Sequence, residues 1–112
     1  RIGYDRDKHY RIGYAVDETA LLRSTVEAFL SEHGRPPSDA AELGAGEKAL
    51  YPDGGYYVLE PEGRIRIRFT VKRELKNRSI VLMPKFDEGD VNWACAADSG
   101  ILQRYLPASC RE

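Results

Sequence analysis

The segment RIRIRFTVK (residues 64–72) decides the fold class, because its side chains alternate strictly between apolar and polar. Successive side chains of an extended strand point to opposite faces of a sheet, so this alternation predicts one buried face and one solvent face. The apolar set is Ile65, Ile67, Phe69 and Val71, and the polar set is Arg64, Arg66, Arg68 and Thr70. The sequence therefore predicts a β-strand with a core face and a basic face.

Three neighbouring segments have the same β-rich character. They are GYYVLE (55–60), SIVLMP (79–84) and VNWACA (91–96), and the turn candidates PEG, KN and DEGD separate the four segments. β-branched and aromatic residues favour strands, while links this short favour antiparallel pairing of consecutive strands. We therefore expect a four-stranded antiparallel sheet over residues 55–96.

The segment AVDETALLRSTVEAFLSEH (15–33) has apolar residues near a 3.6-residue repeat, which indicates an amphipathic helix. Gly34 and the two prolines after Arg35 mark its end. Because the apolar stripe continues upstream, we expect one long helix over residues 1–34. The Pro- and Gly-rich residues 35–54 then form an irregular connector, with one short helical turn around residues 39–43.

These elements together predict an α+β fold in which a long N-terminal amphipathic helix packs on the apolar face of a four-stranded antiparallel sheet. The chain has 112 residues, which suits a single domain over residues 1–112. Its 17 basic and 18 acidic residues give a net charge of −1, so no global field attracts nucleic acid or an anionic membrane. Any charged partner must meet a local patch.

The chain contains two cysteines, Cys95 and Cys110. Metal sites usually have closely spaced ligands, and the two histidines, His9 and His33, lie far from this pair, so we expect no metal and no cofactor. A cysteine pair that spans a short, turn-rich segment favours a structural disulfide and an oxidising compartment. Two buried, reduced cysteines are the alternative.

Three stretches of the chain together resemble type IV pilins of the a class. They are TALLRSTVEAFLSEHGRPPSDAAELG (19–44), the four predicted strands, and VNWACAADSGILQRYLPASCRE (91–112). The last stretch is the most specific, because a W-x-C unit, a short loop and YLP-x-x-CR are similar to the family's disulfide-bounded loop. The residues that carry this likeness are Trp93, Cys95, Tyr105, Leu106, Pro107, Cys110 and Arg111.

The resemblance implies a pilin fold, with a disulfide loop over residues 95–110, and a structural role without enzymatic activity. It implies an extracellular filament, or fimbrium, in which identical subunits form a helical homopolymer that serves adhesion, twitching motility or related surface functions. It also implies passage through the inner membrane and periplasm, with an apolar helical segment before Arg1 as the membrane contact. A host surface is a further partner that it suggests.

The stripe Arg64, Arg66 and Arg68 is a candidate site for nucleic-acid or subunit contact. Guanidinium groups bind phosphate bidentately, so a minor pilin that binds DNA for natural transformation is one alternative function. Aromatic residues that stack on bases are not interleaved with this stripe. A solvated face, or one paired with carboxylates of an adjacent strand or subunit, is therefore favoured.

A pseudopilin of a secretion system is another alternative function. A type II secretion pseudopilin has the same helix and sheet, but the C-terminal pattern belongs by resemblance with pilins. Acidic residues, among them Asp87, Glu88 and Asp90, are candidates to meet the arginine stripe of a neighbouring subunit. No catalytic constellation is visible in the sequence, and we expect Trp93 and Tyr105 to lie in the core.

Overall fold

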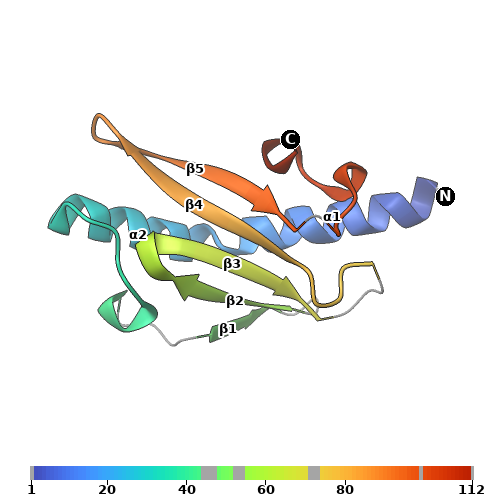
Figure 1. Cartoon of the computed structure of the whole chain (residues 1–112), viewed down its shortest axis with the longest axis horizontal. Helices are drawn as coiled ribbons and strands as arrows, with labels where there is room; N and C mark the ends of the chain where they lie inside the picture. The colour runs from blue at the N-terminus through green and yellow to red at the C-terminus, as the bar shows by residue number, and fades with distance from the viewer. Residues whose placement is uncertain (1, 44–47, 52–54, 71–73, 99, 112) are drawn as a thin grey trace.

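The structure is a computed structural model that describes residues 2–43, 48–51, 55–70, 74–98 and 100–111. Two helices lie nearly end to end along one face of an antiparallel sheet, and the C-terminal segment packs beside the first helix (Figure 1). The helices are α1 (Ile2–Glu18) and α2 (Ala20–His33), and the strands are β1 (Lys48–Tyr51), β2 (Gly55–Glu60), β3 (Arg64–Phe69), β4 (Ser79–Asp87) and β5 (Asp90–Ala97).

The sheet has the order β1-β2-β3-β4-β5, and every neighbouring pair is antiparallel. The predicted meander of four strands is therefore present as β2 to β5. Its register places Ile67 of β3 opposite Tyr57 of β2 and Ile80 of β4. Ile65, Ile67 and Phe69 of β3 are all buried on the side of the sheet that faces the helices, so the alternation predicted for residues 64–69 is confirmed. Residues 71 and 72 of the quoted stretch lie outside the described residues.

A fifth strand corrects the prediction that residues 35–54 form a connector with no strand. β1 pairs with the edge of β2 over Lys48–Tyr51. Strand pairing at a sheet edge uses backbone N–H and C=O groups, which any sequence provides, and four residues are too short for a side-chain pattern. The predicted short helical turn is present as η1 (Ala40–Leu43).

The expected single long helix is interrupted at Thr19, which corrects that prediction. The Thr19 hydroxyl donates to the Val16 carbonyl at 2.6 Å and accepts a hydrogen bond from Arg23 Nε at 3.0 Å. A threonine hydroxyl competes in this way for a carbonyl that helical bonding needs. Thr19 is completely buried, so these bonds also satisfy its polar group. The helix ends as predicted at Gly34, whose φ is 69° and whose N–H donates to Leu30 O.

The main core lies between the helices and the sheet. Its sheet side is formed by side chains such as Ile65, Ile67 and Phe69, all with no exposed surface. Burial of an apolar side chain of this size stabilises the fold by roughly 1.5–3 kcal/mol. None of the helices in the described part of the chain is long and apolar enough to span a membrane. The helix residues in this core are Ile12, Ala15, Val26 and Leu30, with Phe29 also buried.

Candidate functional site

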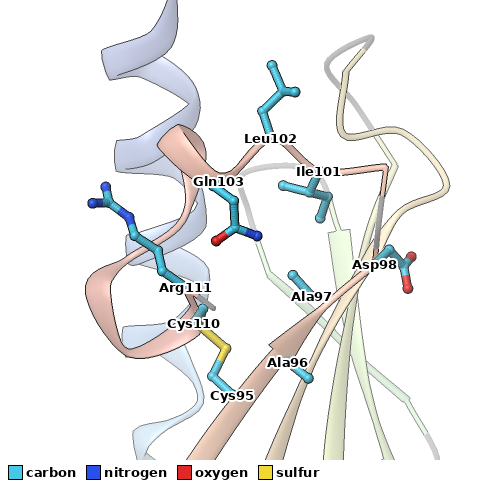
Figure 2. Close-up of a pocket in the computed structure, with 9 residues that line it drawn as sticks. All are labelled: Cys95, Ala96, Ala97, Asp98, Ile101, Leu102, Gln103, Cys110 and Arg111. Atoms are coloured by element: carbon cyan, nitrogen blue, oxygen red, sulfur yellow. A yellow bond between two sulfur atoms is a disulfide. The ribbon is translucent and has the colours of Figure 1, made fainter.

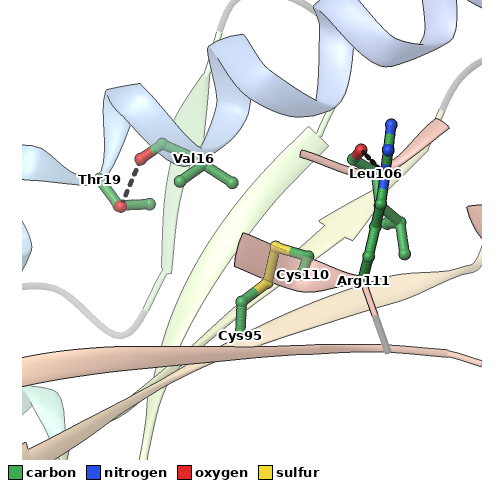
Figure 3. Close-up of a disulfide and its surroundings, with 6 residues drawn as sticks. All are labelled: Val16, Thr19, Cys95, Leu106, Cys110 and Arg111. Carbon is green, nitrogen blue, oxygen red and sulfur yellow. Dashed lines mark hydrogen bonds between the residues drawn. A yellow bond between two sulfur atoms is a disulfide. The ribbon is translucent and has the colours of Figure 1, made fainter. Parts of the chain in front are cut away.

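A disulfide joins Cys95 on β5 to Cys110 in the last helical turn, η4 (Ala108–Cys110), with the two Cα atoms 4.6 Å apart. This confirms the predicted pairing, and the described chain holds no free cysteine. Figure 3 shows the bond between β5 and the helix layer, on the side where Val16 of α1 points toward it. The tail is thus covalently attached to the last strand of the sheet.

Three apolar side chains hold the rest of the tail against the domain. Ile101, Tyr105 and Leu106 are buried and belong to the main core. Tyr105 lies in the short turn η3 (Gln103–Tyr105), which packs against α1. The Arg111 guanidinium reaches back and donates from Nε to Leu106 O at 3.0 Å. The core position expected for Tyr105 is therefore confirmed.

An open cleft of about 410 Å³ lies between the end of β5 and the disulfide loop. In Figure 2 the side chains of Ile101 and Gln103 point into this region, whereas Leu102 and the Arg111 guanidinium point outward. Ala96 and Ala97 of β5 border the cleft next to the disulfide. A concave, mixed apolar and polar surface of this size suits a contact with another molecule.

Asp98 stabilises the strand end that borders this cleft. Its carboxylate accepts a hydrogen bond from Ser79 N at 2.6 Å, and its own N–H donates to Ser79 O. Ser79 is buried, and its hydroxyl lies 3.5 Å from Arg68 Nη1. These bonds connect the start of the loop to β4.

Trp93 connects the sheet to the second helix. Its side chain lies on the helix side of β5 and is half-buried, and its Nε1 donates to the Glu27 carboxylate of α2 at 2.8 Å. The inward direction expected for Trp93 is correct, although the ring is not completely buried. The partner Glu27 was not predicted, because the two residues are 66 positions apart in the sequence.

The structure brings Arg64, Arg66 and Arg68 together on the outer face of β3, opposite the helices. Arg66 forms an ion pair with Glu60 of β2, with Nε 2.7 Å from Oε2, and both side chains are partly exposed. Arg64 donates to Pro61 O at 3.2 Å and borders a second hollow of about 420 Å³ with Met83 and Pro84. Each arginine of the stripe therefore has a partner within the domain.

A second ion pair lies outside the sheet, where the chain leaves α2. Arg35 Nη2 is 2.7 Å from Glu42 Oε2, and Ser38 N donates to the same carboxylate at 2.6 Å. The hydrogen bond from Arg35, and then that from Ser38, lower the pKa of Glu42 to about 2. His33 stacks on Phe29, with ring centroids 4.0 Å apart. In the described residues, no group of three or more His, Cys, Asp or Glu side chains is arranged to hold a metal ion.

Comparison with known proteins relates this fold to one family. A search of curated proteins found no match. A family model described as Pilin (bacterial filament) matches residues 12–111, which include both the helix and sheet layers and the disulfide loop. The members of this family are structural rather than enzymatic subunits of filaments. Because the match covers most of the chain, the chain belongs to the pilin family of bacterial filament proteins.

Proposed function

We propose that this chain forms the outer domain of a type IV pilus subunit, and that the helix face left uncovered by the sheet packs against other subunits. The observation that carries this proposal is the pair of large apolar side chains on that face. Tyr10 is 65% exposed and Leu21 is 81% exposed, and the Tyr10 ring stacks on Tyr14. Apolar groups on a helix that already buries its opposite face in the core favour a further contact.

The rest of the surface suits an extracellular fimbrium. A disulfide is stable in an oxidising compartment, and the loop that it closes presents side chains on the outside of the domain. We propose that the filament serves adhesion to a host surface, twitching motility or related surface functions. The resemblance to type IV pilins also implies an apolar segment ahead of α1. Before assembly, the subunit would pass through the inner membrane and the periplasm.

The substitution Leu21→Glu tests the role of the helix face. Because Leu21 is so exposed, we expect the isolated domain to keep its thermal unfolding temperature while cells that carry the full gene lose their filaments, as counted by electron microscopy. Ser31→Glu, at an exposed polar position of the same helix, is the matched control and should leave the filaments in place. Normal filaments with Leu21→Glu would contradict the packing proposal. Absence of filaments that contain the unaltered chain would contradict the pilus function itself.

A minor pilin that binds DNA through Arg64, Arg66 and Arg68 is the second candidate. Their common position on one sheet face supports it. The pairing of Arg66 with Glu60 weakens it, because a paired guanidinium has less charge to offer a phosphate. A gel-shift assay at low salt tests this candidate. DNA binding by the unaltered domain that is lost when Arg64→Glu, Arg66→Glu and Arg68→Glu are combined would support it, and no binding by the unaltered domain would contradict it. The disulfide-closed loop favours a pilus subunit over a secretion pseudopilin by the same resemblance.

A further inference from the structure

We propose that the tip of the β4–β5 hairpin of one subunit docks into the cleft beside the disulfide loop of the next subunit. Phe86 would enter the cleft, and the acidic residues of the tip would face Arg104 and Arg111. The occupant is therefore a second copy of this chain. The inference rests on the proposed function, because a repeating contact of this kind requires an assembled filament.

The hairpin tip combines an exposed aromatic ring with negative charge. Phe86 continues the helix-facing register of Leu82 but is 56% exposed. Next to it, Asp87, Glu88 and Asp90 are all exposed. An aromatic side chain with this much exposed surface is a common centre of a protein contact.

The backbone holds this tip in one defined shape. Asp87 pairs with Asp90, and the two residues between them both have positive φ, 49° at Glu88 and 90° at Gly89. Two central residues with positive φ form the tight hairpin turn that matches the twist of antiparallel strands. A pre-shaped tip loses little conformational freedom when it docks.

The proposed receptor has the complementary properties. The cleft of about 410 Å³ is lined by apolar groups of Ala96, Ala97 and Ile101, and a phenyl ring fits a space of this size. Leu102 at its rim is 45% exposed. Arg111 lines the cleft and Arg104 is exposed next to the lining residue Gln103, while the acidic Asp98 that also lines it accepts a hydrogen bond from Ser79 N. The two arginines beside this apolar cleft thus complement the acidic residues beside Phe86.

One subunit cannot join its own two surfaces. The hairpin tip and the disulfide loop lie toward opposite ends of the sheet in Figure 1, in a domain whose longest dimension is 47 Å. Two different patches that bind each other make a heterologous contact, which generates an open helical filament unless the rotation closes a ring.

Cysteine cross-linking in assembled filaments tests the contact. The full gene with Asp90→Cys and Leu102→Cys combined, which keeps Phe86, would be expressed, and sheared filaments would be oxidised and analysed on a non-reducing gel. We expect a ladder of dimers and longer multimers, since each subunit would join its neighbours at both ends. The control combines Ser31→Cys with Leu102→Cys, because Ser31 is exposed on α2 and lies outside the proposed contact.

Charge exchange provides the second measurement. Asp87→Lys and Arg104→Glu should each reduce the ladder several-fold, and the two changes together should restore it. Filaments that give no ladder, an equal ladder from the Ser31 control, or failure of the double exchange to restore the ladder would each overturn the docking proposal. These outcomes leave the pilus function intact, whereas a lack of filaments from the unaltered gene would overturn both.

Discussion

The helix and sheet layers and the C-terminal segment 100–111 share one apolar core, but a disulfide also fixes the segment. In the layers, side chains such as Ile65 and Ile67 recur at regular spacing and are completely buried. In the segment, the buried Ile101, Tyr105 and Leu106 have no such spacing, and backbone hydrogen bonds such as that from Tyr105 N to Leu102 O close short turns. A disulfide supplies the remaining constraint.

The two regions therefore have different roles. The layers form a cooperative core whose many contacts do not depend on one bond. The segment presents outward side chains, and irregular backbone needs a few strong attachments to keep one conformation. We therefore expect substitutions in the layers to affect global stability most, and changes to the disulfide to affect the segment most.

Phe69→Ala should give the largest effect. Phe69 has no exposed surface, so removal of its ring leaves a cavity and should lower the free energy of unfolding by about 3–5 kcal/mol, measured by urea denaturation with circular dichroism. Phe86→Ala is the matched control, since the same atoms are removed from a 56% exposed side chain, and it should change stability by less than about 0.5 kcal/mol. Equal losses for the two variants would break the comparison.

Removal of the disulfide by Cys95→Ala with Cys110→Ala should come next. The chain-entropy account gives a loss of about 3 kcal/mol for a loop of this length. Hydrogen exchange should show a larger difference between regions, with amides of residues 100–111 losing protection while those of β3 remain protected. If β3 amides became as exposed as those of the segment, the segment would be part of the same cooperative unit.

Trp93→Phe should have a moderate effect, because it removes one polar bond between the two layers and keeps most of the apolar ring. Loss of the hydrogen bond to Glu27 should cost about 1 kcal/mol in the free energy of unfolding. Glu27→Gln retains an acceptor and should cost less. A larger loss with Glu27→Gln than with Trp93→Phe would show that the carboxylate stabilises α2 by another route.

Glu42→Gln should give the smallest effect, since the Arg35 pair lies on the surface. The folded-state pKa of Glu42 is about 2, below its ordinary value of 4.5, so its contribution is complete above about pH 4.5 and is lost as the pH falls toward 2. Thermal unfolding should therefore show wild type above the variant at pH 6 and the two converging near pH 2. A difference that grew on acidification would contradict this assignment.

The alternation of residues 64–69 was enough to predict β3 and its inner face, because period-two burial is a local property of a strand. The meander around it was predicted from the β-rich composition of the neighbouring segments and their short links. The edge strand β1 was not predictable in this way, since its pairing with β2 depends on backbone groups. The break at Thr19 was also missed. A threonine within a helical pattern ordinarily continues the helix, and only the contacts of Val16 and Arg23 show that its hydroxyl takes a backbone carbonyl.

Some features of the candidate site were predictable from the sequence, and others were not. The two cysteines and the pattern of residues around them predicted the disulfide and the family, because a covalent bond requires particular residue types. The partners of Trp93, Arg66 and Arg35 were not predictable, since hydrogen bonds and ion pairs need only some donor near some acceptor. The sequence contains many donors and acceptors, so many different pairs are possible.

The sequence by itself determined the order of β2 to β5 after a helical region, the buried face of β3 and the two cysteines able to form a disulfide, because periodicity and cysteine count are properties of the chain alone. Only the tertiary structure decided that Glu27 bonds Trp93, that a cleft opens beside Ala96 and Ala97, and that the acidic tip and basic loop lie toward opposite ends. Those features depend on distances between residues remote in the chain, and such distances are set by packing rather than by any local pattern.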